Sequence, residues 1–271
     1  MTLVLLGCGE SVPPPAVTDA PVAVAAPTIA DNPLRDAYFG AVHVHTSYSF
    51  DAFTNGTISM PADAYAWAKG DPIKGNRAGE LLKIVTPLDF YAVSDHAEMM
   101  GVFREMGNPD SPMSKHPLAP RITSTDSNVA LQAFAEVLRD MSSNKVDPAF
   151  TDPAMSKSVW SKIVAAADAA YAPGEFTTFP AFEWSSNPDK RNLHRVVIFG
   201  DSKIVPELAF SALDSSDPEQ LWNWMDAQRA AGSTLLAIPH KRQCERRPDV
   251  LAQRLQRQSA ERCTTHGAAH Q

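Results

Sequence analysis

Residues 38–51 read YFGAVHVHTSYSFD and join an apolar strand to a polar loop. Within this stretch His43 and His45 are two positions apart, so on a strand both imidazoles point to the same face, near the strand's C-terminal end. Two neutral imidazole nitrogens on one face suit a divalent metal ion. Asp51 follows in the loop and either adds a carboxylate ligand or caps the next turn. The stretch therefore predicts a strand that enters the core and ends at a ligand site.

Two further apolar runs are also predicted to be strands, and both carry titratable side chains. The run 88–93 (LDFYAV) predicts a buried strand that is followed at once by Asp95 and His96. The run 176–184 holds Glu183 between Phe182 and Trp184. A buried carboxylate is costly unless an ion or a hydrogen-bond donor compensates its charge. A metal ion is one such compensation.

Two more histidines lie at the ends of predicted strands. His194 opens the strand 194–199, and His240 follows the strand 234–239. A lone histidine in such a position is usually an ordinary core or surface residue. Several of them at strand ends are a stronger signal, because parallel sheets and barrels place their sites at the C-terminal ends of strands.

Simpler interpretations of the same residues remain open. Asp95 is also a reasonable helix cap, with His96 as a surface residue beside it. Glu183 would find an ordinary salt-bridge partner in Arg191 or Arg195.

Strands and helices alternate along the chain, with an irregular insertion at 107–127 that is rich in Pro, Ser and Asn. Helices are predicted at 61–69, 129–141, 157–171 and 217–231. Such alternation is typical of α/β folds with parallel strands wrapped by helices, either as an open sheet or as a barrel.

Composition limits the partners of the protein. The chain has 271 residues, 44% hydrophobic content and a net charge of −7, which favours a folded core and disfavours nucleic acid as a partner. Its three cysteines lack the spacing of a zinc finger or a disulfide framework. No apolar run approaches the length of a transmembrane helix.

The two ends of the chain differ from its middle in composition. Residues 3–8 (LVLLGC) resemble a bacterial lipobox, with Cys8 as the lipid anchor, although a mildly apolar terminus is the alternative. With the Pro- and Ala-rich linker that follows, they form an expected leader at 1–34, which favours an exported, periplasmic or outer-membrane-anchored lipoprotein over a cytoplasmic protein. The metal-binding domain is expected at 35–240. Residues 241–271 form a basic Arg- and Gln-rich tail, either natural or the product of a shifted frame.

Blocks of the sequence, in order, resemble the polymerase and histidinol phosphatase (PHP) superfamily, and most closely its domain of unknown function 3604 family. These blocks are FGAVHVHTSYSFDAF (39–53), PLDFYAVSDHAE (87–98), FPAFEWSS with NLHRVVIFG (179–186 and 192–200) and LLAIPH (235–240). Members of that superfamily begin with His-x-His and continue with an Asp-His pair after a strand.

The resemblance implies a distorted (β/α)7 barrel that holds two or three divalent ions of zinc, manganese or iron. The matching positions imply the metal ligands His43, His45, Asp51, His96, Glu183, His194 and His240. Glu183 would bridge ions, and Asp95 would orient a ligand or balance charge, so both are candidate catalytic residues. The superfamily's closing Asp-x-His pair has no match after His240, so the barrel is expected to be incomplete at its C-terminus.

Hydrolysis by a metal-activated water is the reaction that this resemblance implies. A phosphoester or another small anionic ester is the expected substrate, because neighbouring cations stabilise an anionic centre. Lys190, Arg191 and Arg195 are candidate substrate-binding residues. The alternatives are an amidohydrolase-type C–N hydrolase, which also begins with His-x-His, and an inactive, truncated metal-binding remnant.

Overall fold

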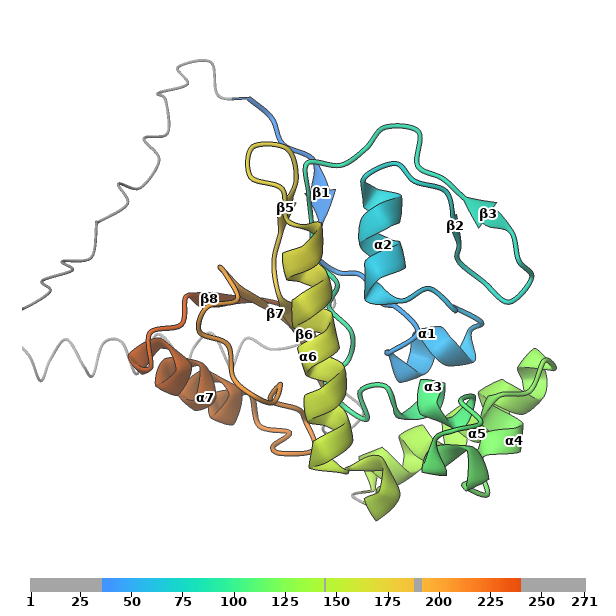
Figure 1. Ribbon diagram of the computed structural model, residues 1–271. Helices are drawn as coiled ribbons and strands as arrows, with labels where there is room; N and C mark the ends of the chain where they lie inside the picture. The colour runs from blue at the N-terminus through green and yellow to red at the C-terminus, as the bar shows by residue number, and fades with distance from the viewer. Residues whose placement is uncertain (1–35, 144, 188–191, 240–271) are drawn as a thin grey trace, which may run out of the picture. The chain divides into compact units, whose positions relative to one another are not determined.

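The computed structural model describes residues 36–143, 145–187 and 192–239. Its contacts divide the chain into the units Met1–Ala37 and Tyr38–Gln271. Every helix and strand described below belongs to the second unit (Figure 1).

The described residues form short strands and longer helices. The strands are β1 (Gly40–Ala41), β2 (Ile73–Lys74), β3 (Leu81–Leu82), β4 (Phe90–Tyr91), β5 (Thr177–Thr178), β6 (Ala181–Ser186), β7 (Leu193–Phe199) and β8 (Leu235–Pro239). The α-helices are α1 (Phe50–Thr54), α2 (Pro61–Ala68), α3 (Val102–Met106), α4 (Ala119–Ile122), α5 (Ser127–Ser142), α6 (Pro153–Ala170) and α7 (Pro218–Ala230). Single 3-10 turns lie at Pro112–Lys115 and Pro148–Phe150.

The strands form three small sheets. The first sheet is parallel and has the order β1-β4-β5. The second is antiparallel and has the order β6-β7-β8. The third is a hairpin in which β2 pairs with β3. The chain is therefore a mixed α/β protein, as predicted. Within the described ranges the strands do not close into a barrel.

The prediction of parallel strands is wrong for β6, β7 and β8. The link from Ser186 to Leu193 is too short for the crossover that a parallel pair requires, so β7 turns back along β6. β8 pairs antiparallel with β7 even though α7 lies between them in sequence. Alternation of strands and helices thus does not fix the strand direction.

A bridge between the segment after β4 and β6 connects the two three-stranded sheets. His96 pairs with Glu183 in the parallel sense, and Asp95 and Ala97 exchange backbone hydrogen bonds of 2.9 and 2.8 Å with Glu183. On the other side of the same segment, the amide of Ser94 donates to the carbonyl of Val44 at 2.8 Å. These bonds bring the residues after β1, the residues after β4 and the middle of β6 side by side.

Aspartates start the three longest helices. The side chains of Asp126, Asp152 and Asp217 each accept a hydrogen bond from the backbone amide two residues later, at the first turns of α5, α6 and α7. Proline follows two of these caps, at Pro153 and Pro218, where the missing N–H costs nothing. The predicted helices α2, α5, α6 and α7 are confirmed.

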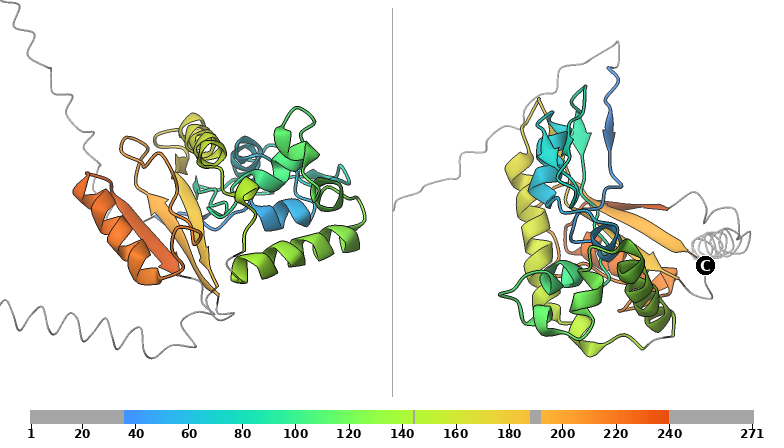
Figure 2. Two further views of the ribbon diagram at one scale, coloured as in Figure 1. Left: turned by 90° about the horizontal axis from the view of Figure 1, so that it is seen from below. Right: turned by 90° about the vertical axis from the view of Figure 1, so that its right-hand side faces the viewer.

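Helices α6 and α7 cover one face of the antiparallel sheet (Figure 2). Trp160 of α6 and Leu221 of α7 pack with Phe182 of β6 and Phe199 of β7, all of them fully buried. Because strand side chains alternate, Glu183, Ser185 and His194 lie on the opposite face of β6 and β7. The helix-covered face is thus part of the hydrophobic core, and the other face carries the polar cluster beside a small apolar group that includes Ala181, Val196 and Ile198.

Three predicted strands are shorter than expected, and one of them is the run 88–93, in which only β4 (Phe90–Tyr91) pairs regularly. Regular pairing of the run 38–45 is limited to β1, so His43 and His45 lie in the irregular segment that follows it. The run 176–184 is divided into β5 and β6 around Pro180, whose nitrogen has no hydrogen to donate to a ladder.

Candidate metal centre

Five segments of the chain converge on one cluster of histidines and carboxylates. His43 and His45 follow β1, Asp51 lies on α1, His96 follows β4, Glu183 lies on β6 and His194 on β7. Six of the seven predicted ligands therefore lie together. The seventh, His240, lies outside the described residues, as do Lys190, Arg191 and Cys8.

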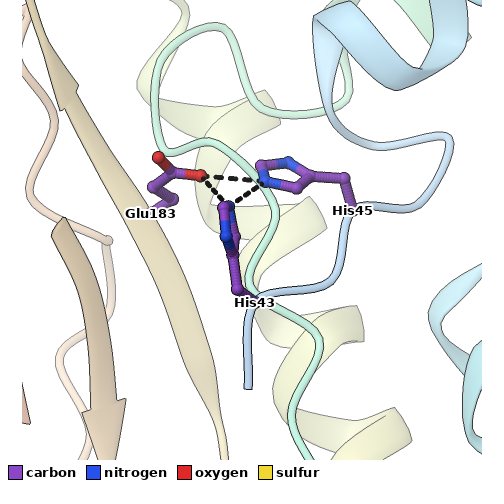
Figure 3. A group of neighbouring side chains, drawn as sticks. All are labelled: His43, His45 and Glu183. Carbon is purple, nitrogen blue, oxygen red and sulfur yellow. Dashed lines mark hydrogen bonds and ion pairs between the residues drawn. The ribbon is translucent and has the colours of Figure 1, made fainter. Parts of the chain in front are cut away.

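Glu183 is the hub of the cluster. Its side chain is 1% exposed, and its Oε2 lies 3.1 Å from Nε2 of His43 and 2.8 Å from Nε2 of His45 (Figure 3). Its other oxygen, Oε1, lies 2.8 Å from Nδ1 of His194. One buried carboxylate thus contacts three imidazoles from two separate parts of the chain.

The two histidines of the His-x-His pair also approach each other. Their Nε2 atoms are 2.9 Å apart, and both are directed at the same oxygen of Glu183 (Figure 3). Each nitrogen can direct either a proton or a lone pair at this oxygen, and two lone pairs beside a carboxylate oxygen are the donor set that zinc, manganese and iron accept. His43 remains 43% exposed, so this part of the cluster is open to solvent.

Asp51 and His96 form the next part of the cluster. Oδ2 of Asp51 lies 3.4 Å from Nε2 of His96, and Oδ1 lies 3.9 Å from Nδ1 of His45. Burial alone would raise the pKa of Asp51, but the hydrogen bond from His96 and the charges of both histidines outweigh it and lower the pKa to about 2. Asp51 is therefore an anion at neutral pH.

The same balance sets the charge of Glu183. Burial would raise its pKa, but hydrogen bonds with His194, His43 and His45 hold the pKa well below its usual range. In return, burial lowers the pKa of His45, while the hydrogen bond to Glu183 and the charge of Asp51 raise it more, so the net shift is upward. The cluster thus stabilises negative charge on its carboxylates and attracts positive charge between them.

Asp95 supports the cluster through hydrogen bonds with the loop that follows His45. It is fully buried, and its oxygens accept hydrogen bonds from the amide and hydroxyl of Thr46, both at 2.6 Å, and from the hydroxyl of Ser49 at 2.8 Å. Ser49 in turn contacts Nδ1 of His45 at 2.7 Å. Asp95 therefore holds the loop that carries His45. Burial raises the pKa of Asp95 despite these bonds.

Three polar residues of the site were not singled out from the sequence. Ser49 connects Asp95 to His45, Ser185 contacts Nδ1 of His96, and Glu98 is fully buried behind Ser185. The serines of the TSYSFD loop and of β6 were visible as polar residues, but only the tertiary pairing shows which ring each one touches.

Arg195 lies apart from the cluster. It neighbours His194 on β7, so its side chain projects from the opposite face, where its guanidinium lies 5.8 Å from the centre of the Trp222 ring. Its Nη1 donates to the carbonyl of His194 at 2.9 Å. This position does not support the expected role of Arg195 in binding substrate.

The donor atoms fit divalent cations. Three overlapping groups, each with donor atoms within 4.8 Å of one another, are His43, His45 and Glu183; His45, Asp51 and His96; and His96, Glu183 and His194. Each group mixes neutral imidazole with at least one carboxylate, which suits zinc, manganese or iron. Glu183 has two carboxylate oxygens and could serve two neighbouring ions, whereas His45 and His96, as neutral imidazoles with one lone pair, would each bind a single ion.

The whole cluster lies inside a recognised family match. A family model described as protein of unknown function (DUF3604) matches residues 32–245. No curated protein and no solved structure matches the chain. The described part of the chain contains no helix long and apolar enough to cross a membrane.

Proposed function

This chain belongs to the DUF3604 family, and from that membership and the geometry of its histidine cluster we propose that it is a metal-dependent hydrolase of the PHP type. The observation that carries the proposal is Glu183, a buried carboxylate in contact with three histidines. Arrangements of this kind are costly to maintain unless a cation shares the site.

We assign the ions to the ligand groups already described. The candidate groups are His43, His45 and Glu183; His45, Asp51 and His96; and His96, Glu183 and His194. Each group would offer ligands to one ion, and His45 and His96 would each bind the ion of only one of their two groups, because a neutral imidazole has one lone pair. Because His43, Asp51 and His194 each occur in one group only, any two groups use five of the six ligands, and three ions are needed to use all six. The finer proposal of a PHP-type (β/α)7 barrel rests on the order of the sequence blocks.

Divalent ions in such a site supply Lewis-acid activation of water and neutralise charge that develops on an ester. The protein's own residues fix where this happens. Glu183 and Asp51 supply the negative charge that holds cations, Asp95 and Ser49 fix the ring of His45, and the exposed side of His43 leaves room for a substrate. The substrate class that gains most is a small anionic ester, with phosphoesters first.

The test uses the whole chain, stripped with chelator and reloaded separately with zinc, manganese or ferrous iron. Elemental analysis is expected to give two or more ions per chain, together with metal-dependent hydrolysis of p-nitrophenyl phosphate or its diester. The Glu183→Gln variant should lose both properties, while Glu105→Gln on α3 should keep them.

Other outcomes discriminate between the alternatives. Bound ions with no turnover of phosphate, sulfate or carboxylate esters would favour a metal-binding protein without hydrolase activity. Metal-dependent cleavage of an amide ring instead of an ester would favour the C–N hydrolase. Less than one ion per folded chain would contradict the proposal.

A further inference from the structure

Glu98 is a buried carboxylate for which the ligand groups give no role. It lies two residues after His96 in the segment that follows β4, and its side chain is 0% exposed. Ionised carboxylates are rarely buried unless each oxygen is satisfied, because desolvation costs several kcal/mol.

The two oxygens of Glu98 have different surroundings. Oε1 accepts hydrogen bonds from the backbone amides of Ser185 at 3.1 Å and Ala212 at 2.6 Å, which ties β6 to the segment between β7 and α7. Oε2 is buried and has no hydrogen-bond partner among the described residues. It lies 3.9 Å from Nδ1 of His96. Oε1 thus has a structural role, and Oε2 faces the metal centre.

Nδ1 of His96 is surrounded by oxygen atoms. The hydroxyl of Ser185 contacts it directly, and carboxylate oxygens of Glu98 and Glu183 each lie 3.9 Å away. Carboxylates accept hydrogen bonds and do not donate them, so this environment favours a proton on Nδ1. Nε2 lies 3.4 Å from Asp51 and can donate to it when no cation is present; once a cation lies beside Asp51, a proton kept on Nδ1 leaves the lone pair of Nε2 for the ion. Phe50 stacks on the ring at 4.6 Å and restricts its rotation.

We propose that Glu98 is a positioning residue that keeps the proton of His96 on Nδ1, so that Nε2 presents its lone pair to the ion shared with Asp51. Partners of this kind behind metal-bound histidines fix the tautomer and strengthen the ligand. The inference rests on the proposed metal site and deepens it, because it assigns which nitrogen of His96 is the ligand.

Glu98→Gln isolates the role of Oε2. The glutamine oxygen must stay where two backbone amides donate to it, so the NH2 group takes the place of Oε2. This group donates towards Nδ1 and favours the opposite tautomer of His96, with a proton on Nε2. The variant therefore keeps the tie to Ser185 and Ala212 while it reverses the hydrogen-bond preference at His96.

The measurement is zinc and manganese affinity by chelator competition, on the whole chain, in four proteins: wild type, Glu98→Gln, His96→Ala and the double variant. Glu98→Gln is expected to lower the affinity of at least one site about 10- to 100-fold. On the His96→Ala background the same change should cost less than about twofold, because a residue that acts through His96 has no further effect once the ring is gone. Glu105→Gln is the matched control, and thermal unfolding checks that all variants fold.

An affinity that Glu98→Gln leaves within twofold of wild type overturns the inference. So does an equal loss in both backgrounds, which would mean a purely structural role. These outcomes do not depend on turnover: a wild type that binds metal, shows the coupling and hydrolyses no ester contradicts only the proposed function. Hydrolysis with unchanged affinity in Glu98→Gln contradicts only the role of Glu98. A wild type that binds no ion contradicts both.

Discussion

The Nε2 atoms of His43 and His45 lie 2.9 Å apart, and both are about 3 Å from one oxygen of Glu183. Without a cation, this trio can be held only by protons shared between the rings and the carboxylate. A divalent ion satisfies all three atoms at once, because each offers it a lone pair. Under the proposed function, Glu183 is therefore the residue whose loss should weaken ion binding most.

Replacing Glu183 with glutamine is expected to lower zinc affinity by more than about a hundredfold, since even a partner of a ligand costs 10- to 100-fold. The amide keeps the size of the side chain and removes its charge. Chelator competition measures the effect. An affinity within tenfold of wild type would show that the histidines hold the ion without Glu183.

Asp95→Asn tests the support beneath the cluster. The carboxylate accepts hydrogen bonds from Thr46 and Ser49, and bonds to a charged group are worth about 1.5–3 kcal/mol each. Asparagine keeps only some of them, so urea unfolding should show a loss of about 1–3 kcal/mol. Asp110→Asn at an exposed position should change stability by less than about 0.5 kcal/mol. Equal effects of the two changes would contradict a special role for Asp95.

Alanine substitutions at two glycines distinguish the energetic cost of backbone strain from that of a steric clash. Gly101 has φ +79° and a Cβ added there would lie 2.6 Å from Val159 of α6, whereas Gly56 has φ +95° and nothing within 4 Å. Gly56→Ala should cost about 1–2 kcal/mol through backbone strain alone. Gly101→Ala should cost about 1–3 kcal/mol more, because α6 must shift. Equal losses in urea unfolding would mean that the contact with Val159 relaxes freely.

The ionisation of Tyr91 is expected to lower the free energy of unfolding in alkaline solution. Burial raises the pKa of Tyr91 from its usual 10 to about 12. A raised pKa gives stability that is complete below pH 10 and is lost as pH rises towards 12, because the unfolded chain ionises first. At pH 11 the loss is roughly 1.4 kcal/mol, the value of one pKa unit.

Tyr91→Phe removes this ionisation. The difference in unfolding free energy between wild type and Tyr91→Phe should therefore shift in favour of the variant between pH 8 and pH 11, as measured by urea unfolding at both values. A difference that stays constant over this range would show that Tyr91 does not titrate as a buried phenol.

Much of the site could be predicted because its ligands are of distinctive types at the ends of apolar runs. His43, His45, His96 and His194 carry rings that bind metal, and their positions beside buried strands indicated a common edge. Glu183 was recognisable because a carboxylate between Phe182 and Trp184 needs compensation. The helices were predicted from their amphipathic pattern, although the cap at Asp152 starts α6 at Pro153, four residues before the predicted start at 157.

The rest depends on tertiary pairing that no local pattern encodes. Ser185 and Glu98 are common residue types, and they matter only because the bridge between His96 and Glu183 places them behind the ring of His96. β7 runs antiparallel to β6 because the link from Ser186 to Leu193 is short, and the apolar pattern of the two strands does not show their relative direction. Arg195 carries the positive charge expected of a residue that binds an anionic substrate, but on β7 its side chain lies on the face opposite to that of His194.

Two residues that touch in the cluster are far apart in sequence: His43 and Glu183 are separated by 140 positions. During synthesis, the earliest histidines emerge long before the residues that complete their coordination. Under the proposed function, capture of an ion by the full set of ligands would therefore be a late event, after β6 and β7 have docked onto the segments that follow β1 and β4. Ion release and loss of this docking should accordingly occur together, so a bound metal would report on the integrity of the whole sheet and not only on its immediate ligands.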